Sequence, residues 1–148
     1  MNKDTNLCKW IEIADKIEKY GKDSQLRIEL EMELDKLEEL SCDEVRFAIS
    51  CYLLNKKKLA LYLGAVFAVE QLIQKRTELL RAVDLLNLKK KYNISSLTET
   101  SETEASLFAS MIEQNDDYLA VAIQEERECF AALADDEQAE MLIWKLSR

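Results

Sequence analysis

One stretch, from Leu59 to Leu88, constrains the fold of this chain more than any other. It reads LALYLGAVFAVEQLIQKRTELLRAVDLLNL, without proline, and its one glycine, Gly64, lies among strong helix formers. Apolar residues recur every seven positions, with partners three residues further on, which predicts one apolar face along a helix. A second apolar face consists of Leu61, Ala65, Ala68, Leu72, Leu79 and Leu86. A helix that is apolar on two sides should be central to a bundle and covered by neighbours on both.

The composition favours an all-α fold built around this helix. Proline is absent from the 148 residues and glycine occurs twice, so the turn chemistry of an all-β protein is missing. Hydrophobic residues make up 48% and charged residues 33%, which is typical of a folded globule. We therefore expect a single domain over residues 1–148. Its fold should be an antiparallel bundle of about five to seven helices around a long central helix at about residues 59–91.

Two shorter helices are expected before the central one. Apolar residues three and four apart predict a helix from about Asn6 to Tyr20, and Gly21 is a natural stop. Asp23 or Ser24 can cap a second helix that runs to about Leu40. Between Leu26 and Leu34 apolar and polar residues also alternate strictly, which is a strand pattern. A helix is favoured there, because a lone strand cannot satisfy its backbone hydrogen bonds.

The sequence between Ser41 and Lys58 leaves open whether a third helix ends there or continues into the central helix. Ser41 and Glu44 match a capping box, which predicts the start of a third helix. The seven-residue spacing continues from Val45 into the central helix, so residues 43–91 form either one helix or two. Lysines suit the last turn of a helix better than its first, so a stop or kink near Asn55 to Lys58 is favoured.

After Tyr92 the sequence changes character. Residues 93–103 are rich in Ser, Thr and Glu and predict a loop, because these side chains compete with the helix for backbone hydrogen bonds. Ser101 to Glu104 matches a second capping box that would end this loop. A turn is expected at Asn115 to Asp117, and the acidic residues from Asp135 predict the start of a last helix.

The sequence offers no recognisable reaction site. Cys8, Cys42, Cys51 and Cys129 form no C-x-x-C pair, and the chain has no histidine to complete a zinc site or a nucleophile pair. We expect free thiols, no catalytic residues, no metal and no cofactor. No N-terminal secretory signal is evident, and the longest uncharged apolar run is too short to cross a bilayer, so we expect a cytoplasmic protein without a membrane span.

Charge is unevenly distributed along the chain. Residues 24–44 carry a net charge of −6, residues 45–92 a net charge of +7 and residues 93–148 a net charge of −10. The overall charge of −9 opposes nucleic-acid binding, which depends on uncompensated Lys and Arg. Pairing between neighbouring helices is the simplest use of these charges, and an acidic surface that attracts a basic protein is the functional alternative. The candidate residues of that surface are Glu125, Glu126, Glu128, Asp135, Asp136 and Glu137.

The length of the central helix points to self-association. Residues 59–91 would span about 50 Å as a helix, whereas a compact monomer of this size has a diameter of roughly 40 Å. We expect a homo-oligomer, with a dimer favoured. The candidate self-association face comprises Leu59, Tyr62, Val66, Val69, Ile73, Leu80 and Val83. Aspartate at Val66 or at Ile73 should accordingly unfold the protein or break its assembly.

Three classes of function follow. The first is a non-enzymatic binding module, such as an adaptor, an inhibitor or immunity-type protein, or a subunit of a larger assembly. The second is a self-associating structural protein that uses the face between Leu59 and Leu88. The third is an enzyme or small-ligand binder that relies on carboxylates or thiols. The acidic composition and the missing catalytic groups favour the first class.

Overall fold

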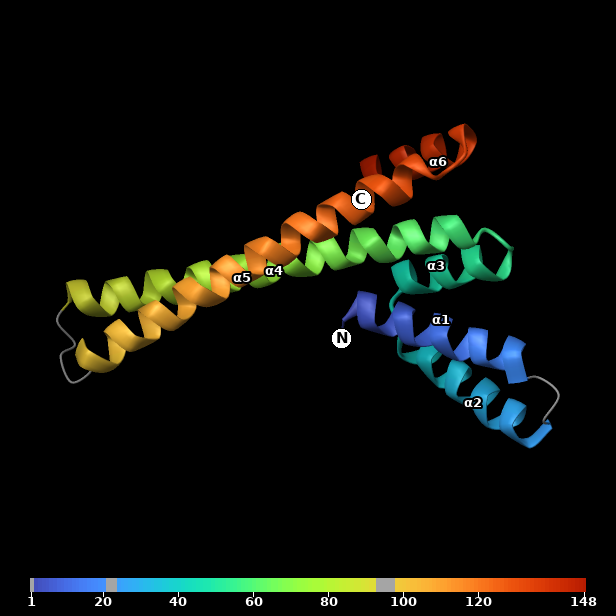
Figure 1. Cartoon of the computed structure of the whole chain (residues 1–148), viewed down its shortest axis with the longest axis horizontal. Coiled ribbons are helices and arrows are strands. Elements are labelled where there is room, and N and C mark those ends of the chain that lie inside the picture. The colour runs from blue at the N-terminus through green and yellow to red at the C-terminus, as the bar shows by residue number, and fades with distance from the viewer. Residues whose placement is uncertain (1, 21–23, 93–97) are drawn as a thin grey trace. The chain divides into compact units, whose positions relative to one another are not determined.

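The computed structural model describes residues 2–20, 24–92 and 98–148, and these residues form six helices and no strand (Figure 1). The helices are α1 (Lys3–Tyr20), α2 (Ser24–Leu40), α3 (Asp43–Leu53), α4 (Lys57–Lys91), α5 (Thr98–Ala131) and α6 (Asp135–Leu146). The predicted all-α bundle with a long central helix is confirmed, and α4 is that helix.

The chain divides into two compact units, which are described separately. The core unit comprises Met1–Ala68 and Glu125–Arg148, and the hairpin unit comprises Val69–Gln124. The single domain expected from the sequence stays a prediction.

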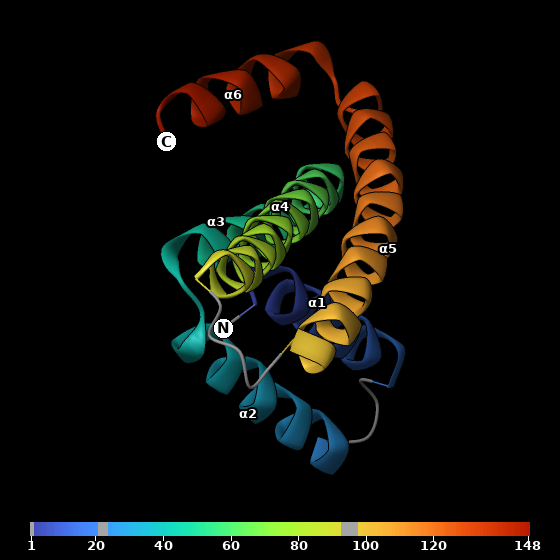
Figure 2. The same cartoon turned by 90° about the vertical axis from the view of Figure 1, so that its left-hand side faces the viewer.

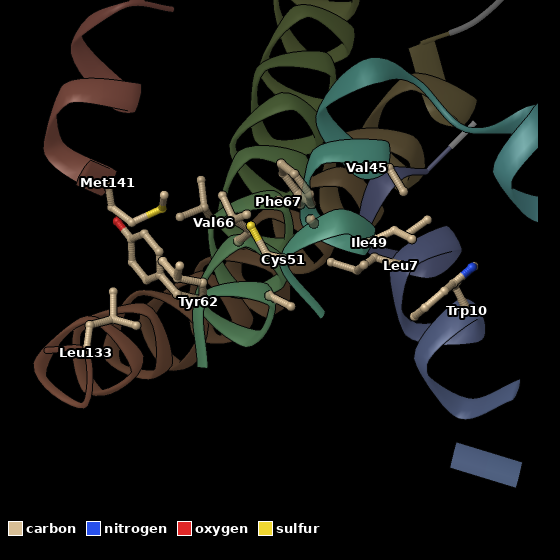
Figure 3. Packing of buried hydrophobic residues seen from close by; sticks show 14 residues of the cluster. Leu7, Trp10, Val45, Ile49, Cys51, Tyr62, Val66, Phe67, Leu133 and Met141 are labelled. Atoms are coloured by element: carbon tan, nitrogen blue, oxygen red, sulfur yellow. The ribbon is translucent and has the colours of Figure 1, made fainter. Parts of the chain in front are cut away.

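The core unit is built around the first three turns of α4. Leu59, Tyr62 and Val66 are buried there. The cluster to which they belong also contains Leu7, Trp10, Val45, Ala48, Ile49, Cys51, Leu133 and Met141. Figure 3 shows Tyr62 beside Leu133 and Met141, and Leu7 beside Ile49. In the core unit, α1, α3 and the first part of α4 thus each bury an apolar stripe.

Helices α1 and α2 run antiparallel to each other (Figures 1 and 2). In α2, Leu30, Leu34 and Leu37 are half-buried, whereas Ile28 and Met32 are exposed. The inward residues are therefore spaced by three and four, and the helical interpretation of this segment is confirmed. The expected stop at Gly21 and cap at Asp23 lie outside the described residues.

Residues 43–91 form two helices, as favoured from the sequence. Asn55 has a φ of 65°, in the left-handed region that asparagine tolerates better than most residues. The Asn55 amide donates to the Tyr52 carbonyl, and the Lys56 amide donates to the Cys51 carbonyl at 2.9 Å. These two hydrogen bonds form a Schellman motif, which terminates α3. The chain changes direction there, before α4 begins.

The capping box expected at Ser41 and Glu44 is wrong. Helix α3 has Cys42 at its N-cap, without a side-chain capping bond. The Ser41 hydroxyl instead donates to the Leu37 carbonyl at the end of α2. Arg46 completes that helix end, because its guanidinium donates to the carbonyls of Glu38 and Glu39. The Ser41 side chain therefore binds a carbonyl at the C-terminal end of α2 and does not cap the N-terminus of α3.

Glu44 ties three segments of the core unit together. Its carboxylate accepts from Lys3 Nζ at 2.8 Å and from Arg148 Nη2 at 2.7 Å. Burial alone would raise the pKa of Glu44, but the two hydrogen bonds hold it below its ordinary value of 4.5. The guanidinium of Arg148 also lies 4.4 Å from the ring centroid of Trp144.

The hairpin unit consists of the second part of α4 and the first part of α5, which pack antiparallel (Figure 1). Leu79 and Leu86 are buried on α4, and Ala122 is buried on α5. Asn115 is also buried, and its Nδ2 donates to the Leu72 carbonyl at 3.0 Å. A buried amide at such a position can fix the register of two helices.

Three expectations for the second half of the chain are wrong. No turn occurs at Asn115 to Asp117, because α5 is continuous from Thr98 to Ala131. Asn115 bonds to α4, and Asp116 pairs with Arg76 at 2.8 Å, so the polar residues serve contacts between helices. The loop expected at residues 93–103 is helical from Thr98 onward, a stretch in which Glu99 and Glu102 are strong helix formers. Its first five residues, 93–97, lie outside the described residues. The capping box at Ser101 therefore does not start a helix.

The last helix begins where the sequence predicts. Helix α6 starts at Asp135, with three acidic residues in its first turn. Glu137 Oε1 accepts a hydrogen bond from the Ala134 amide at 3.2 Å, which satisfies one backbone donor near the helix start.

Val66→Asp and Ile73→Asp should differ sharply in stability, whereas the sequence led us to expect that either change unfolds the protein or breaks its assembly. Val66 is 4% exposed, whereas Ile73 is 48% exposed. Val66→Asp buries an unpaired charge and should lower the free energy of unfolding by about 3–5 kcal/mol. Ile73→Asp should lower it by less than about 1 kcal/mol. Urea unfolding followed by circular dichroism checks this, and equal losses would contradict the burial of α4 described above.

Glu44→Gln should destabilise the protein in a pH-dependent way. The lowered pKa means that the carboxylate stabilises the fold above its unfolded pKa, and this contribution disappears as pH falls through its folded pKa. We expect a loss of about 1 kcal/mol at pH 7, because the group is partly exposed, and a progressively smaller loss as pH falls through the folded pKa of Glu44. Exposed Glu29→Gln is the control and should show no such loss. A loss at Glu44 that is independent of pH would contradict the ionic contacts.

Candidate functional site

An open groove in the core unit is the strongest candidate for a functional site. It has a volume of about 430 Å³ and lies among α1, the start of α4 and the end of α5. The residues that line it are Asp4, Leu7, Cys8, Ile11, Ala60, Leu61, Gly64, Ala65, Ala68, Glu125, Glu128 and Cys129. Most of these side chains are apolar, so the groove can bury an apolar surface of a partner.

The floor of the groove is part of the second apolar face of α4. Leu61, Ala65 and Ala68 belong to this face, and Leu61 is 56% exposed. A β-carbon added at Gly64 would lie 3.4 Å from Leu7 Cδ2, so α1 already contacts α4 on one side of the floor. The sequence predicts that both faces of α4 are covered, but this part of the second face is open.

The charged residues that line the groove are all acidic. Asp4 comes from the first turn of α1, and Glu125 and Glu128 come from the last two turns of α5. Burial raises the pKa of Asp4, although the hydrogen bond from the Cys8 thiol lowers it. The groove therefore presents negative charge beside an apolar floor.

The two thiols of the groove are held in their protonated form. Burial raises the pKa of Cys8 to about 11, and the nearby Asp4 and Glu12 carboxylates add to this shift. Burial, Glu125 and Glu128 raise the pKa of Cys129. A reactive cysteine needs a lowered pKa, because the thiolate is the nucleophile. Both thiols thus contribute apolar surface rather than nucleophiles.

The six acidic residues predicted as a partner surface are used in different ways. Glu125 and Glu128 line the groove. Glu126 pairs with Lys145 at 2.6 Å, and Glu137 accepts a hydrogen bond at the start of α6. Asp135 and Asp136 are exposed in the first turn of α6.

The residues predicted as a self-association face are mostly covered by the chain itself. Leu59, Tyr62 and Val66 are buried in the core unit, and Val69 is buried in the hairpin unit. In the hairpin unit Ile73 and Leu80 are exposed, and Val83 is half-buried. The buried positions there are instead Leu79 and Leu86, because a straight α-helix drifts away from a strict seven-residue repeat.

Sequence reasoning missed Asp4 and Cys8 as site residues and missed the opening between α1 and α5. One signal was available in the small residues Ala60, Gly64 and Ala68, spaced by four along one face of the helix. Such a row permits close approach of another helix, but the sequence does not tell whether that helix belongs to the same chain.

A second hollow of about 450 Å³ lies between α2 and α3. Asp35, Glu38 and Glu39 line it together with Arg46, whose guanidinium is already bonded to the end of α2. Ile49 and Leu53 also line this hollow, but it offers less apolar surface than the groove.

Among the described residues, no cluster of three or more Cys, Asp or Glu residues could hold a metal ion. Within the same residues, no helix has the length and apolar character needed to cross a membrane.

Comparison of the chain with protein-family models, with curated proteins and with solved structures finds no match.

Native Cys8 should react slowly with iodoacetamide despite its exposure. A pKa of about 11 lowers its thiolate fraction near neutral pH, so we expect alkylation roughly tenfold to a hundredfold slower than in the urea-unfolded protein. Asp4→Asn should accelerate the reaction, because it removes the carboxylate that accepts the thiol hydrogen bond. Peptide mass spectrometry measures the rate at Cys8, and equal rates in native and unfolded protein would contradict this description of the groove.

Proposed function

We propose that this protein is a non-enzymatic binding module that holds an amphipathic helix of another protein in its groove. The observation that carries the proposal is the open second face of α4, bounded by α1 and by the end of α5. The bound helix would complete the covering of α4 that its two apolar faces require.

The lining of the groove favours a helix over other occupants. Ala65, Ala68 and Gly64 are small, so the backbone of a bound helix can approach α4 closely. Helices that bind in this way present apolar anchors spaced by three, four and seven residues. The protruding Leu61 can pack between two such anchors.

The rim of the groove defines the charge of the partner. Asp4, Glu125 and Glu128 are the charged residues of the lining, so lysines or arginines should flank the apolar anchors of the bound helix. The same rim repels the phosphates of a nucleic acid. Contacts between exposed charges weaken with salt, so binding should weaken as ionic strength rises.

The alternative of a thiol-dependent enzyme has less support. The pKa values of Cys8, Cys51 and Cys129 are all raised by burial, which disfavours the thiolates that such chemistry needs. We further propose that the protein acts in the cytoplasm, where its free cysteines would stay reduced.

Leu61→Glu should abolish binding of a designed helical peptide while leaving the fold intact. The probe is a synthetic amphipathic helix with leucines spaced i, i+3 and i+7 and with lysines flanking them. Placing a charge in the apolar floor should weaken binding at least about tenfold, or about 1.4 kcal/mol. Fluorescence anisotropy of the labelled peptide, titrated with the full-length protein, measures the affinity.

Two controls accompany this titration. Leu107→Glu changes a leucine of similar exposure, 58% against 56% for Leu61, on a part of α5 outside the groove, and it should bind like the wild type. A second peptide with glutamates in place of the lysines should not bind. Equal affinity of the wild type and Leu61→Glu, or preference for the glutamate peptide, would overturn the proposed function.

A further inference from the structure

The end of α4 carries a second unpartnered apolar surface. Leu85, Leu88 and Tyr92 are exposed there, at the spacing i, i+3 and i+7. At about 100° per residue these three side chains share one side of the helix, away from the buried Leu86. The surface that they form is called the terminal stripe below.

Lysines flank the terminal stripe. Lys89 and Lys91 lie on its two sides by helical geometry, and Lys90 lies between them in sequence. All three are exposed, and Lys91 Nζ lies 6.0 Å from the ring centroid of Tyr92. The hydrogen bond from the Tyr92 amide to the Leu88 carbonyl extends the helical conformation to the end of the stripe.

The terminal stripe thus has the chemistry that the groove requires. It is a helical surface with apolar anchors at the expected spacing and basic residues beside them, whereas the groove is apolar with a rim of Asp4, Glu125 and Glu128. We propose that the groove of one copy binds the terminal stripe of a second copy of this chain. This inference rests on the proposed function and names the partner.

The geometry of this contact determines the kind of assembly. The groove and the terminal stripe consist of different residues, so the contact is heterologous, and each pair of copies retains one unoccupied groove and one unoccupied stripe. Further copies can therefore add until a ring closes, and otherwise an open chain forms. This differs from the dimer expected from the sequence, which uses one face of the helix twice.

Sedimentation velocity of the full-length protein over a range of concentrations tests the inference. The wild type should form species larger than a dimer at high concentration and dissociate as salt is raised. Leu61→Glu in the groove and Leu88→Glu in the terminal stripe should each be monomeric. The matched controls Leu107→Glu and Ile73→Glu should associate like the wild type, because Ile73 is as exposed as Leu88 on the same helix, at 48%.

Mixing the two inactive variants gives the sharpest result. The Leu61→Glu variant keeps an intact stripe and the Leu88→Glu variant keeps an intact groove, so their mixture should form a one-to-one dimer and nothing larger. Self-association of Leu88→Glu alone would overturn the inference, because it would mean that the stripe is not used. A mixture that stays monomeric, although the wild type associates, would overturn it as well.

The outcome separates this inference from the proposed function. If the lysine-flanked peptide binds the groove but the wild type stays monomeric at all concentrations, the second-copy inference fails and the binding module remains. If the peptide does not bind and the protein does not associate, both fail. Binding of the wild type, but not of Leu88→Glu, to anionic lipid vesicles, with no association in solution, would assign the terminal stripe to a membrane surface and overturn the inference.

Discussion

The two apolar faces of α4 are the constraint on which the rest of the structure depends. In the core unit, α1, α3, α6 and the end of α5 cover the face that contains Leu59 and Tyr62. The other face, at Leu61, Ala65 and Ala68, remains open as the floor of a groove. Exposed apolar surface is unfavourable in water. A partner that covers this face would therefore be stabilised by burial of apolar surface that remains exposed after folding.

The groove combines this exposed apolar floor with negatively charged residues in its lining. Burial raises the pKa of the thiols in the groove, the carboxylates beside them add to this shift, and the acidic rim favours cations at its edge. Both effects follow from carboxylates next to a partly buried apolar surface, where charges interact more strongly than in bulk water. One arrangement of side chains therefore accounts both for the raised pKa of the thiols and for the basic helical partner that we propose.

Most of the helices could be predicted from the sequence, because apolar spacing and acidic helix starts are local signals. The start of α6 at Asp135 is an example, and the break near Asn55 followed from another local signal, the lysines that suit the last turn of a helix. The functions of single polar residues could not be predicted, because they depend on the neighbouring helix. Asn115 resembled a turn residue, but its amide bonds to Leu72. The groove itself could be predicted only in part, since the sequence defines the second face of α4 without telling whether the chain covers it.

The most direct test of this account is a methyl NMR titration of the alanine-labelled protein with the lysine-flanked peptide. The account predicts that the methyl resonances of Ala65 and Ala68, in the groove, shift in proportion to binding. The exposed Ala109 and Ala120 of the hairpin unit should not shift. Peptide binding that leaves Ala65 and Ala68 unchanged would contradict the claim that the open face of α4 is the binding site.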